Sequence, residues 1–199
     1  MNFWDDKFNI DEYLYGKEAN SFLKEILMDL PKGKILFVCE GEGRNSVYAA
    51  KLGFEVFAFD SSSVGRDKAL RLANDNDVNI EYDLRDALDI DYPENTFDYI
   101  VLIFAHFPSE IRQSIHHKLY NCLNNNGKII MEAFNPKQLD FTSGGPKNID
   151  MLYTKTLIQN DFPKLEILLL EEKQIILNEG DLHQGQAEVV RFIGKKSIS

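Results

Sequence analysis

The chain has 199 residues, a hydrophobic content of 44% and a formal net charge of −10 at pH 7. This length and composition predict a single domain over residues 1–199, with one hydrophobic core. The acidic charge argues against a nucleic-acid backbone or an anionic membrane surface as the main partner, because both would repel it. The sequence contains no signal-like start and no apolar run of membrane-spanning length, so we expect a cytoplasmic protein. Cys39 and Cys122 lack metal-ligand spacing, and no metal site is expected.

The first segment, residues 3–16, is rich in aromatic residues but shows no helical or strand period. Disordered tails are poor in aromatic residues, so we expect an ordered lead-in. Its aromatic side chains, Trp4, Tyr13 and Tyr15, either plug a hydrophobic edge or cover the mouth of a site. Residues 18–30 are predicted to form a helix that ends before Pro31. Residues 1–30 are therefore expected to be a cap segment followed by a helix.

The next stretch, residues 35–46, carries the main signal for fold and function. The apolar run 35–39 predicts a central strand buried on both faces, and residues 45–52 predict a helix. Between them lies Glu40-Gly41-Glu42-Gly43, whose glycines allow a sharp turn and the close approach of a ligand. Strand, glycine turn and helix in this order are typical of the nucleotide-binding corner of a doubly wound sheet. The two carboxylates would repel a pyrophosphate but suit a ligand with positive groups. A simple turn without a ligand is the alternative.

Polar residues then follow three further predicted strands, 55–59, 79–82 and 99–104. Open α/β sheets bind ligands outside the carboxyl ends of their strands, so these residues are candidates for a site. Asp60 either binds ribose hydroxyls or caps the helix predicted at 64–74. Asp86 follows the short third strand, and a solvated acidic loop is the alternative there. His106 is the candidate for substrate contact and for a base, with a structural histidine as the equal alternative.

The last part of the chain is predicted to be a helix at 109–123, a strand at 128–134 containing Glu132, and a short helix at 154–161. The long loop between this strand and the short helix, residues 135–152 with Gly144-Gly145, is a candidate lid, because loops of this length in compact domains are usually functional or disordered. Strands at 165–177 and 187–194 follow without a helix between them, which predicts an antiparallel pair. The fold class is therefore a doubly wound α/β protein with a mostly parallel, seven-stranded sheet and a terminal antiparallel strand.

Together these features resemble the class I S-adenosylmethionine-dependent methyltransferases. The resemblance rests on Glu40 with the two glycines, Asp60, the Asp86-Ala87 pair and the closing strand pair, and it covers nearly the whole chain. Within the class the chain is similar to the small, single-domain tellurite-resistance and thiopurine-type enzymes. Glu42 departs from the family pattern, which commonly has a small residue there. The resemblance implies S-adenosylmethionine as the cofactor, with these cofactor-binding residues: Glu40, Gly41, Gly43, Asn45, Asp60, Ser61, Leu84, Asp86, Ala87, Phe104 and Tyr15.

The implied reaction is methyl transfer to a small molecule such as a thiol or a metalloid, with His106 as the base if the accepting atom is oxygen. After the fourth strand there is no Asn/Asp-Pro-Pro-Tyr/Phe signature of methyltransferases that act on bases or glutamine amides. A non-catalytic module that binds the cofactor or a partner protein is one alternative. An NAD(P)-dependent oxidoreductase is another, disfavoured by Glu42 and by the antiparallel pair. The sequence assigns no oligomeric state.

Overall fold

The computed structural model describes residues 3–197, and this part of the chain contains a seven-stranded sheet with the order β3-β2-β1-β4-β5-β7-β6. Neighbouring strands from β3 to β5 pair in parallel, whereas β7 is antiparallel to both β5 and β6. The predicted fold class is confirmed, with the antiparallel strand second from the edge. The strands are β1 (Lys34–Val38), β2 (Glu55–Asp60), β3 (Glu81–Leu84), β4 (Phe97–Ile103), β5 (Leu123–Phe134), β6 (Leu165–Glu179) and β7 (His183–Lys196).

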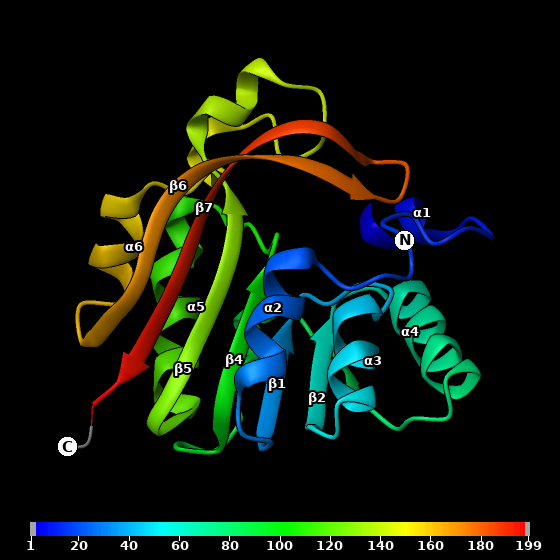
Figure 1. The fold of residues 1–199 in the computed structure, drawn as a ribbon, viewed down its shortest axis with the longest axis horizontal. Helices are drawn as coiled ribbons and strands as arrows, with labels where there is room; N and C mark the ends of the chain where they lie inside the picture. The colour runs from blue at the N-terminus through cyan, green and yellow to red at the C-terminus, as the bar shows by residue number, and fades with distance from the viewer. Residues whose placement is uncertain (1–2, 198–199) are drawn as a thin grey trace.

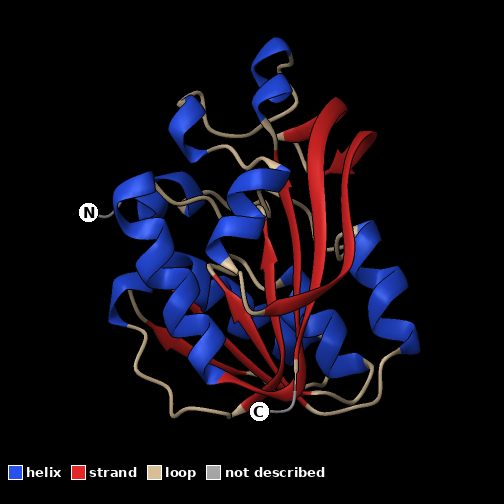
Figure 2. Ribbon diagram, turned by 90° about the vertical axis from the view of Figure 1, so that its left-hand side faces the viewer, coloured by secondary structure: helices blue, strands red, loops and turns tan. Residues whose placement is uncertain are grey.

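Helices cover both faces of this sheet (Figures 1 and 2). The side chains of β1 explain why: Ile35 and Phe37 pack in one core cluster, Leu36 and Val38 in the other, and all four are at most 2% exposed. A strand buried on both faces needs a helical layer on each, because burying one such side chain contributes roughly 1.5–3 kcal/mol. The first cluster includes side chains of α2 (Ser21–Asp29) and α3 (Arg44–Lys51), and the second those of α5 (Ser109–Cys122) and α6 (Lys155–Asp161); α4 (Ser63–Asp75) packs beside α3.

The amino-terminal segment differs from its prediction. Residues Phe3–Phe8 form a short helix, α1, where the sequence was interpreted as aperiodic, so that interpretation is wrong. The missed signal is the i, i+4 spacing of Trp4 and Phe8, whose rings stack with centroids 5.5 Å apart. Acidic residues in the first turn, Asp5 and Asp6, also favour a helix start. The segment is thus ordered, as expected, and α1 contacts α4.

The carboxyl-terminal hairpin also differs from its prediction. β6 and β7 extend to Glu179 and His183 and are joined by a tight turn, instead of ending at 177 and 187 with a long connection. Gly180 makes this turn possible because its φ is +65°, in the left-handed region. Beyond the last β5–β7 pair, Phe134 with Val189, the two strands pair only with each other. Figure 1 shows this free part bending over the sheet edge toward α1. The bend brings Glu179 and His183 to the carboxyl end of the sheet.

Two smaller findings complete the fold. β5 begins at Leu123 instead of at residue 128, because Leu123 already pairs with Phe97 of β4. The candidate lid, residues 135–152, contains two short 3₁₀ turns, η2 (Pro136–Asp140) and η3 (Ile149–Met151), and a further one, η1 (Ala87–Asp89), follows β3. Among residues 3–197, no helix has both the length and the apolar character needed to cross a membrane.

Candidate active site

The glycine turn between β1 and α3 holds the two glycines in left-handed conformations, with φ of +63° at Gly41 and +89° at Gly43. The two positions serve different neighbours. A Cβ atom at Gly43 would lie 2.8 Å from the Cα of Ala69, so this glycine permits the close packing of α3 on α4. A Cβ atom at Gly41 would lie 3.1 Å from the ring of Phe8, which covers the turn. Gly43 is therefore a packing glycine, and Gly41 is the one that faces the covered side of the turn.

Glu40 closes the amino terminus of α3. Its Oε1 accepts hydrogen bonds from the backbone N–H groups of Asn45 at 2.9 Å and Ser46 at 2.6 Å. Burial raises the pKa of Glu40 from its ordinary 4.5 to about 7, and these hydrogen bonds only partly offset it. The side chains of Asn45 and Ser46 also hydrogen-bond to this carboxylate. A carboxylate thus occupies the donors that a pyrophosphate would need, and its negative charge suits a positive group.

Glu42 does not face a ligand, contrary to the expectation from its place in the turn. It is 4% exposed and forms an ion pair with Lys68 of α4 at 2.5 Å. Its other oxygen accepts the backbone N–H of Leu14 at 2.8 Å, and Lys68 in turn donates to the carbonyl of Ile10 at 3.0 Å. The charge of Glu42 therefore holds the amino-terminal segment over α4. The carboxylate that would repel a pyrophosphate is therefore that of Glu40.

Asp60, at the end of β2, lies directly beneath the glycine turn. Its two oxygens accept the backbone N–H groups of Gly41 at 3.0 Å and Ser62 at 2.9 Å. Burial raises its pKa, although these hydrogen bonds act in the opposite direction. A carboxylate has about four acceptor positions, so both oxygens can also accept ligand hydroxyls. The amino terminus of α4 beside it is capped by Asp5 of α1, which accepts the hydroxyl of Ser62 at 2.7 Å.

The remaining cofactor candidates lie in three places: the start of α3, the surroundings of His183 and the end of β2, and the carboxyl end of β3. Asn45 is buried and accepts the backbone N–H of Asn20 at 3.0 Å, so its side chain positions the start of α2. The rings of Tyr15 and Phe104 lie 4.6 and 4.7 Å from that of His183, and Ser61 directly follows β2. Leu84, the last residue of β3, and Asp86 are exposed and Ala87 is buried, with Asp86 capping η1 through the backbone N–H of Leu88.

His106 has no free ring nitrogen. Its Nδ1 lies 2.7 Å from the carbonyl oxygen of Met151, and its Nε2 accepts the backbone N–H of Phe134 at 3.3 Å. Burial lowers the pKa of this histidine to about 4. Both nitrogens therefore serve the backbone, which joins the end of β5 to the candidate lid. This geometry gives His106 the structural role and moves the search for a base elsewhere.

A largely buried group that we call the hairpin cluster consists of Tyr15, Arg44, Glu179 and His183. Sequence reasoning proposed Tyr15 for the site but missed Arg44 and Glu179. Glu179 accepts a hydrogen bond from Nη2 of Arg44 at 2.8 Å, and the same oxygen lies 3.5 Å from Nδ1 of His183. Burial would raise the pKa of Glu179, but His183 and Arg44 outweigh it and lower the pKa. The sequence signal was the charged residues beside Gly180, which were assigned to the connection between the last two strands.

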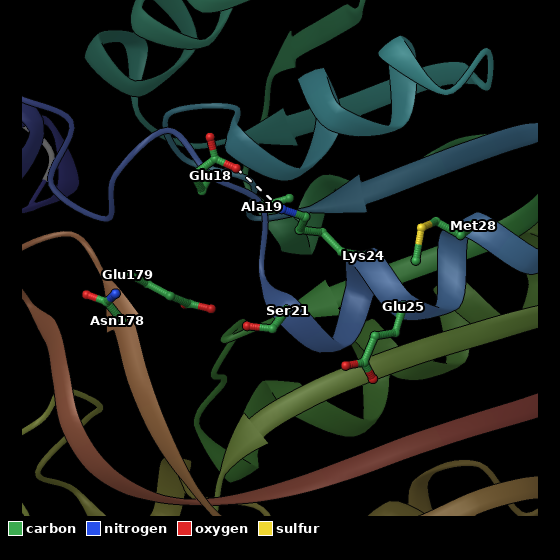
Figure 3. Close-up of a pocket in the computed structure, with 8 residues that line it drawn as sticks. All are labelled: Glu18, Ala19, Ser21, Lys24, Glu25, Met28, Asn178 and Glu179. Carbon is green, nitrogen blue, oxygen red and sulfur yellow. Dashed lines mark hydrogen bonds and ion pairs between the residues drawn. The ribbon is translucent and has the colours of Figure 1, made fainter.

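Glu132 joins this cluster to the sheet. It is 0% exposed, and its oxygens accept hydrogen bonds from Asn20 at 2.7 Å and Arg191 at 2.6 Å. Asn20 also donates to Glu179 at 3.0 Å. A hollow of about 380 Å³ between α2 and the end of β6 reaches Glu179 from outside (Figure 3). Its lining includes Glu18, Lys24 and Glu25, so it is a charged surface feature separate from the glycine turn.

The comparison with known proteins agrees with this fold and indicates a methyltransferase. Residues 35–127, from β1 into β5, match the sequence profile of a family described as a methyltransferase domain. The strand order and the antiparallel β7 agree with this match. Residues 35–127 thus resemble methyltransferase domains. This match implies S-adenosylmethionine-dependent methyl transfer as the reaction and S-adenosylmethionine as the cofactor.

Solved structures resemble the methyltransferase over most of its length. TehB from Haemophilus influenzae has a TM-score of 0.75 and 19% identity, covering 98% of this chain and 66% of its own. A protein described for the conversion of a disulfide bond into a thioacetal group during echinomycin biosynthesis has a TM-score of 0.78 and 13% identity, with 94% and 85% covered. A methyltransferase from Methanosarcina mazei has values of 0.67 and 16%, with 92% and 100% covered. At these identities the likeness concerns the fold. No curated protein matches the sequence.

Proposed function

We propose that this methyltransferase transfers the methyl group of S-adenosylmethionine to a small, protic acceptor in the cytoplasm. The observation that supports the cofactor site is Glu40, which accepts the first backbone N–H groups of α3 and so places a carboxylate, suited to a positive group, at the glycine turn. The acidic net charge of −10 favours a small molecule over a nucleic acid. The related folds named above include one linked to chemistry at sulfur, which agrees with a thiol or comparable soft acceptor.

The proposed cofactor site lies at the carboxyl ends of β1, β2 and β4. Gly41 lets the ligand approach the turn, and Asp60 accepts the ribose hydroxyls with its remaining acceptor positions. Leu84, Asp86 and Ala87 are the proposals for the adenine ring, because they lie at and just after the carboxyl end of β3. Ser61, Tyr15 and Phe104 complete the lining.

We infer that the base is His183 instead of His106. Its ring lies among those of Tyr15, Phe104 and Phe134, at centroid distances of 4.6, 4.7 and 5.4 Å. Glu179, which is charged at neutral pH, accepts from Nδ1, so the proton of the neutral imidazole lies on Nδ1. In residues 3–197, Nε2 of His183 has no hydrogen-bond partner. It is therefore available to take a proton from an acceptor.

The bound cofactor supplies a methyl group on a positively charged sulfur, which is already a strong electrophile. The protein then has to hold the accepting atom in line, and orientation of this kind is worth up to about 7–11 kcal/mol. Transfer would form a bond between the accepting atom and the methyl carbon and break the methyl–sulfur bond, whose electron pair would stay on sulfur. The acceptor proton passes to Nε2 of His183. The aromatic rings exclude water from this place and favour an apolar acceptor.

The amino-terminal segment and the 135–152 loop are the proposed lid. Phe8 covers Gly41, and Lys68 of α4 holds the carbonyl groups of the segment, so a ligand at the turn has to displace or contact it. Trp4, the single tryptophan, stacks on Phe8 and reports on this contact. Addition of S-adenosylhomocysteine should shift its fluorescence and slow proteolysis within 135–152. No response to ligand would make both segments static parts of the fold.

Calorimetric titration with S-adenosylhomocysteine and with NAD⁺ tests the cofactor site. Asp60→Asn should weaken S-adenosylhomocysteine binding by roughly ten- to hundred-fold, because hydrogen bonds to a charged acceptor are lost. The matched control is Asp98→Asn, which removes a carboxylate that binds Lys34 and Asn124 at the opposite end of the sheet. The control should leave the dissociation constant unchanged. Preference for NAD⁺ would contradict the assignment, and cofactor binding without methylation of any thiol or phenol would favour the binding-module alternative.

A further inference from the structure

The two edges of the sheet are built differently. β3, at one edge, has only 4 residues, and two of them, Glu81 and Asp83, are acidic. β6, at the other edge, has 15 residues without a proline, and within residues 3–197 it pairs only with β7. Figure 2 faces this edge and shows helices on either side of the strands. Natural sheets keep edge strands short, charged or covered, because an open edge pairs with other strands. β3 follows this rule, whereas β6 offers a long open edge.

The sequence of β6 is apolar at both ends of its exposed part and charged in the middle. Two apolar stretches, residues 167–170 and 175–177, flank the polar centre Glu-Glu-Lys-Gln at 171–174. Several of the apolar side chains face solvent: Leu168 is 46% exposed and Ile176 is 79% exposed. From either end the strand shows the same order of apolar, charged and apolar residues. It therefore matches an antiparallel copy of itself.

We propose that a second copy of this chain pairs with β6 along its open edge, antiparallel, about a two-fold axis at Glu172. In this register Glu171 of each copy lies opposite Lys173 of the other, and Leu169 lies opposite Ile175. Side chains directly opposite each other in an antiparallel pair share a face, with Cβ atoms about 4.5–5.5 Å apart. The dimer thus gains two charge pairs and two apolar pairs. Residues 169–175 also lie beyond the bulge that separates Ile167 from Leu169.

Neighbouring registers do not match in this way. An axis at Glu171 would place Leu169 opposite Lys173, and an axis at Lys173 would place Glu171 opposite Ile175. An axis between two residues would set side chains from different faces against each other. The proposed register has one repulsive contact, Glu172 against its own copy, and the net charge of −10 on each chain also opposes association. Salt screens the long-range part of this repulsion beyond about 8 Å at 0.15 M.

Sedimentation velocity over a range of protein concentrations, at 0.15 M salt, measures the dimer directly. The wild type should show a monomer–dimer equilibrium. Lys173→Glu and Glu171→Lys each turn both charge pairs into repulsive ones, so each variant alone should raise the dimer dissociation constant by roughly ten-fold or more. A mixture of the two variants should associate as the wild type does, because every glutamate then lies opposite a lysine.

Two further variants test the position of the axis and the specificity of the effect. Glu172→Gln removes the repulsion on the axis and should lower the dimer dissociation constant by roughly two- to five-fold. Its side chain is exposed, so the variant should fold even if a charge reversal does not. The matched control is Lys51→Glu, which makes the same charge change as Lys173→Glu at an exposed position on α3 and should leave the equilibrium unchanged. Circular dichroism verifies that each variant is folded.

Three outcomes would overturn the dimer. One is a wild type that stays monomeric at its highest soluble concentration, which would leave the edge to a strand of a different protein or to solvent. Another is a mixture of Lys173→Glu and Glu171→Lys that fails to associate although both variants are folded. The third is an equal loss of association in Lys51→Glu. None of these measurements needs cofactor or acceptor, so their failure is separate from a failure of the proposed methyl transfer.

Discussion

Two clusters in this methyltransferase contain the same kinds of side chain, namely an arginine, a histidine, a tyrosine and a carboxylate. They differ in how the histidine is paired and in where the cluster lies. The hairpin cluster combines Tyr15, Arg44, Glu179 and His183. The second group, which we call the α5–α6 cluster, combines Arg112, His116, Tyr153 and Asp161. Each has a carboxylate that pairs with an arginine at 2.8 Å and contacts Nδ1 of a histidine. Composition alone therefore does not separate a site from a structural contact.

The difference lies in the other histidine nitrogen and in the location. Nε2 of His116 is 3.4 Å from the hydroxyl of Tyr153, and the side chains of His116 and Asp161 are 0% exposed. This cluster joins two helices on one face of the sheet. In the hairpin cluster, Nε2 of His183 is unused in the described chain, and so is Nη1 of Arg44. Buried atoms without a hydrogen-bond partner occur in both clusters, since Asp161 Oδ1 is one as well, so the distinction rests on the histidine nitrogen and on the position at the carboxyl end of the strands.

The largest expected effect comes from a substitution that breaks the α5–α6 cluster. Asp161→Ala should lower the free energy of unfolding by about 3–5 kcal/mol, because it leaves the buried charge of Arg112 without its partner. Denaturant unfolding measures this loss. The dissociation constant for S-adenosylhomocysteine should stay unchanged in protein that is still folded. A weakened affinity would mean that the two clusters are coupled, and the division into scaffold and site would fail.

The second prediction compares the replacement of His183 with that of His116. His183→Asn should lower the turnover of a thiol or phenol acceptor by about a hundred-fold, because general-base catalysis contributes at least that factor. Stability should change little, since only one bond to Glu179 is lost and that bond is long, at 3.5 Å. His116→Asn is the control, with lowered stability and normal turnover per folded molecule. Equal turnover in both variants would remove His183 from the reaction.

The third prediction uses the raised pKa of Glu40, about 7 against an ordinary 4.5. Between these values the folded protein holds a proton that the unfolded chain has lost. The contribution of Glu40 to stability is therefore fully present below pH 4.5 and is lost as the pH rises through 7, by up to about 3 kcal/mol. The difference in unfolding free energy between wild type and Glu40→Gln should change accordingly between pH 5 and 8. The affinity for S-adenosylhomocysteine should rise over the same interval, because its ammonium group favours the charged carboxylate. A pH-independent difference would place Glu40 outside this role.

The fold was predictable because its signals are local and repeated. The apolar run at 35–38, the glycine turn and the two closing strands each predict an element, and together they give the sheet. The site was less predictable because it depends on atoms from distant segments. Glu42 and His106 have the right positions at strand ends, but Lys68 and the backbone of Met151 use their polar atoms. Nothing in the local sequence reveals such partners. Arg44 and Glu179 were missed for the same reason, since the bend of the β6–β7 hairpin alone brings them together.

The smallest expected effect sharpens the distinction within the glycine turn itself. Gly43 and Gly53 have nearly equal φ values, +89° and +91°, so an alanine at either position pays a similar backbone strain of about 1–2 kcal/mol. At Gly53 a Cβ atom would meet nothing within 4 Å, whereas at Gly43 it would lie 2.8 Å from the backbone of Ala69. Gly43→Ala should therefore lower the free energy of unfolding by about 1–3 kcal/mol more than Gly53→Ala, which is the cost of overpacking alone. Denaturant unfolding of both variants isolates this difference. Equal losses would show that α4 shifts to make room for the new methyl group. If the Gly43→Ala variant were then stable but bound S-adenosylhomocysteine more weakly, Gly43 would be a residue that contacts the ligand.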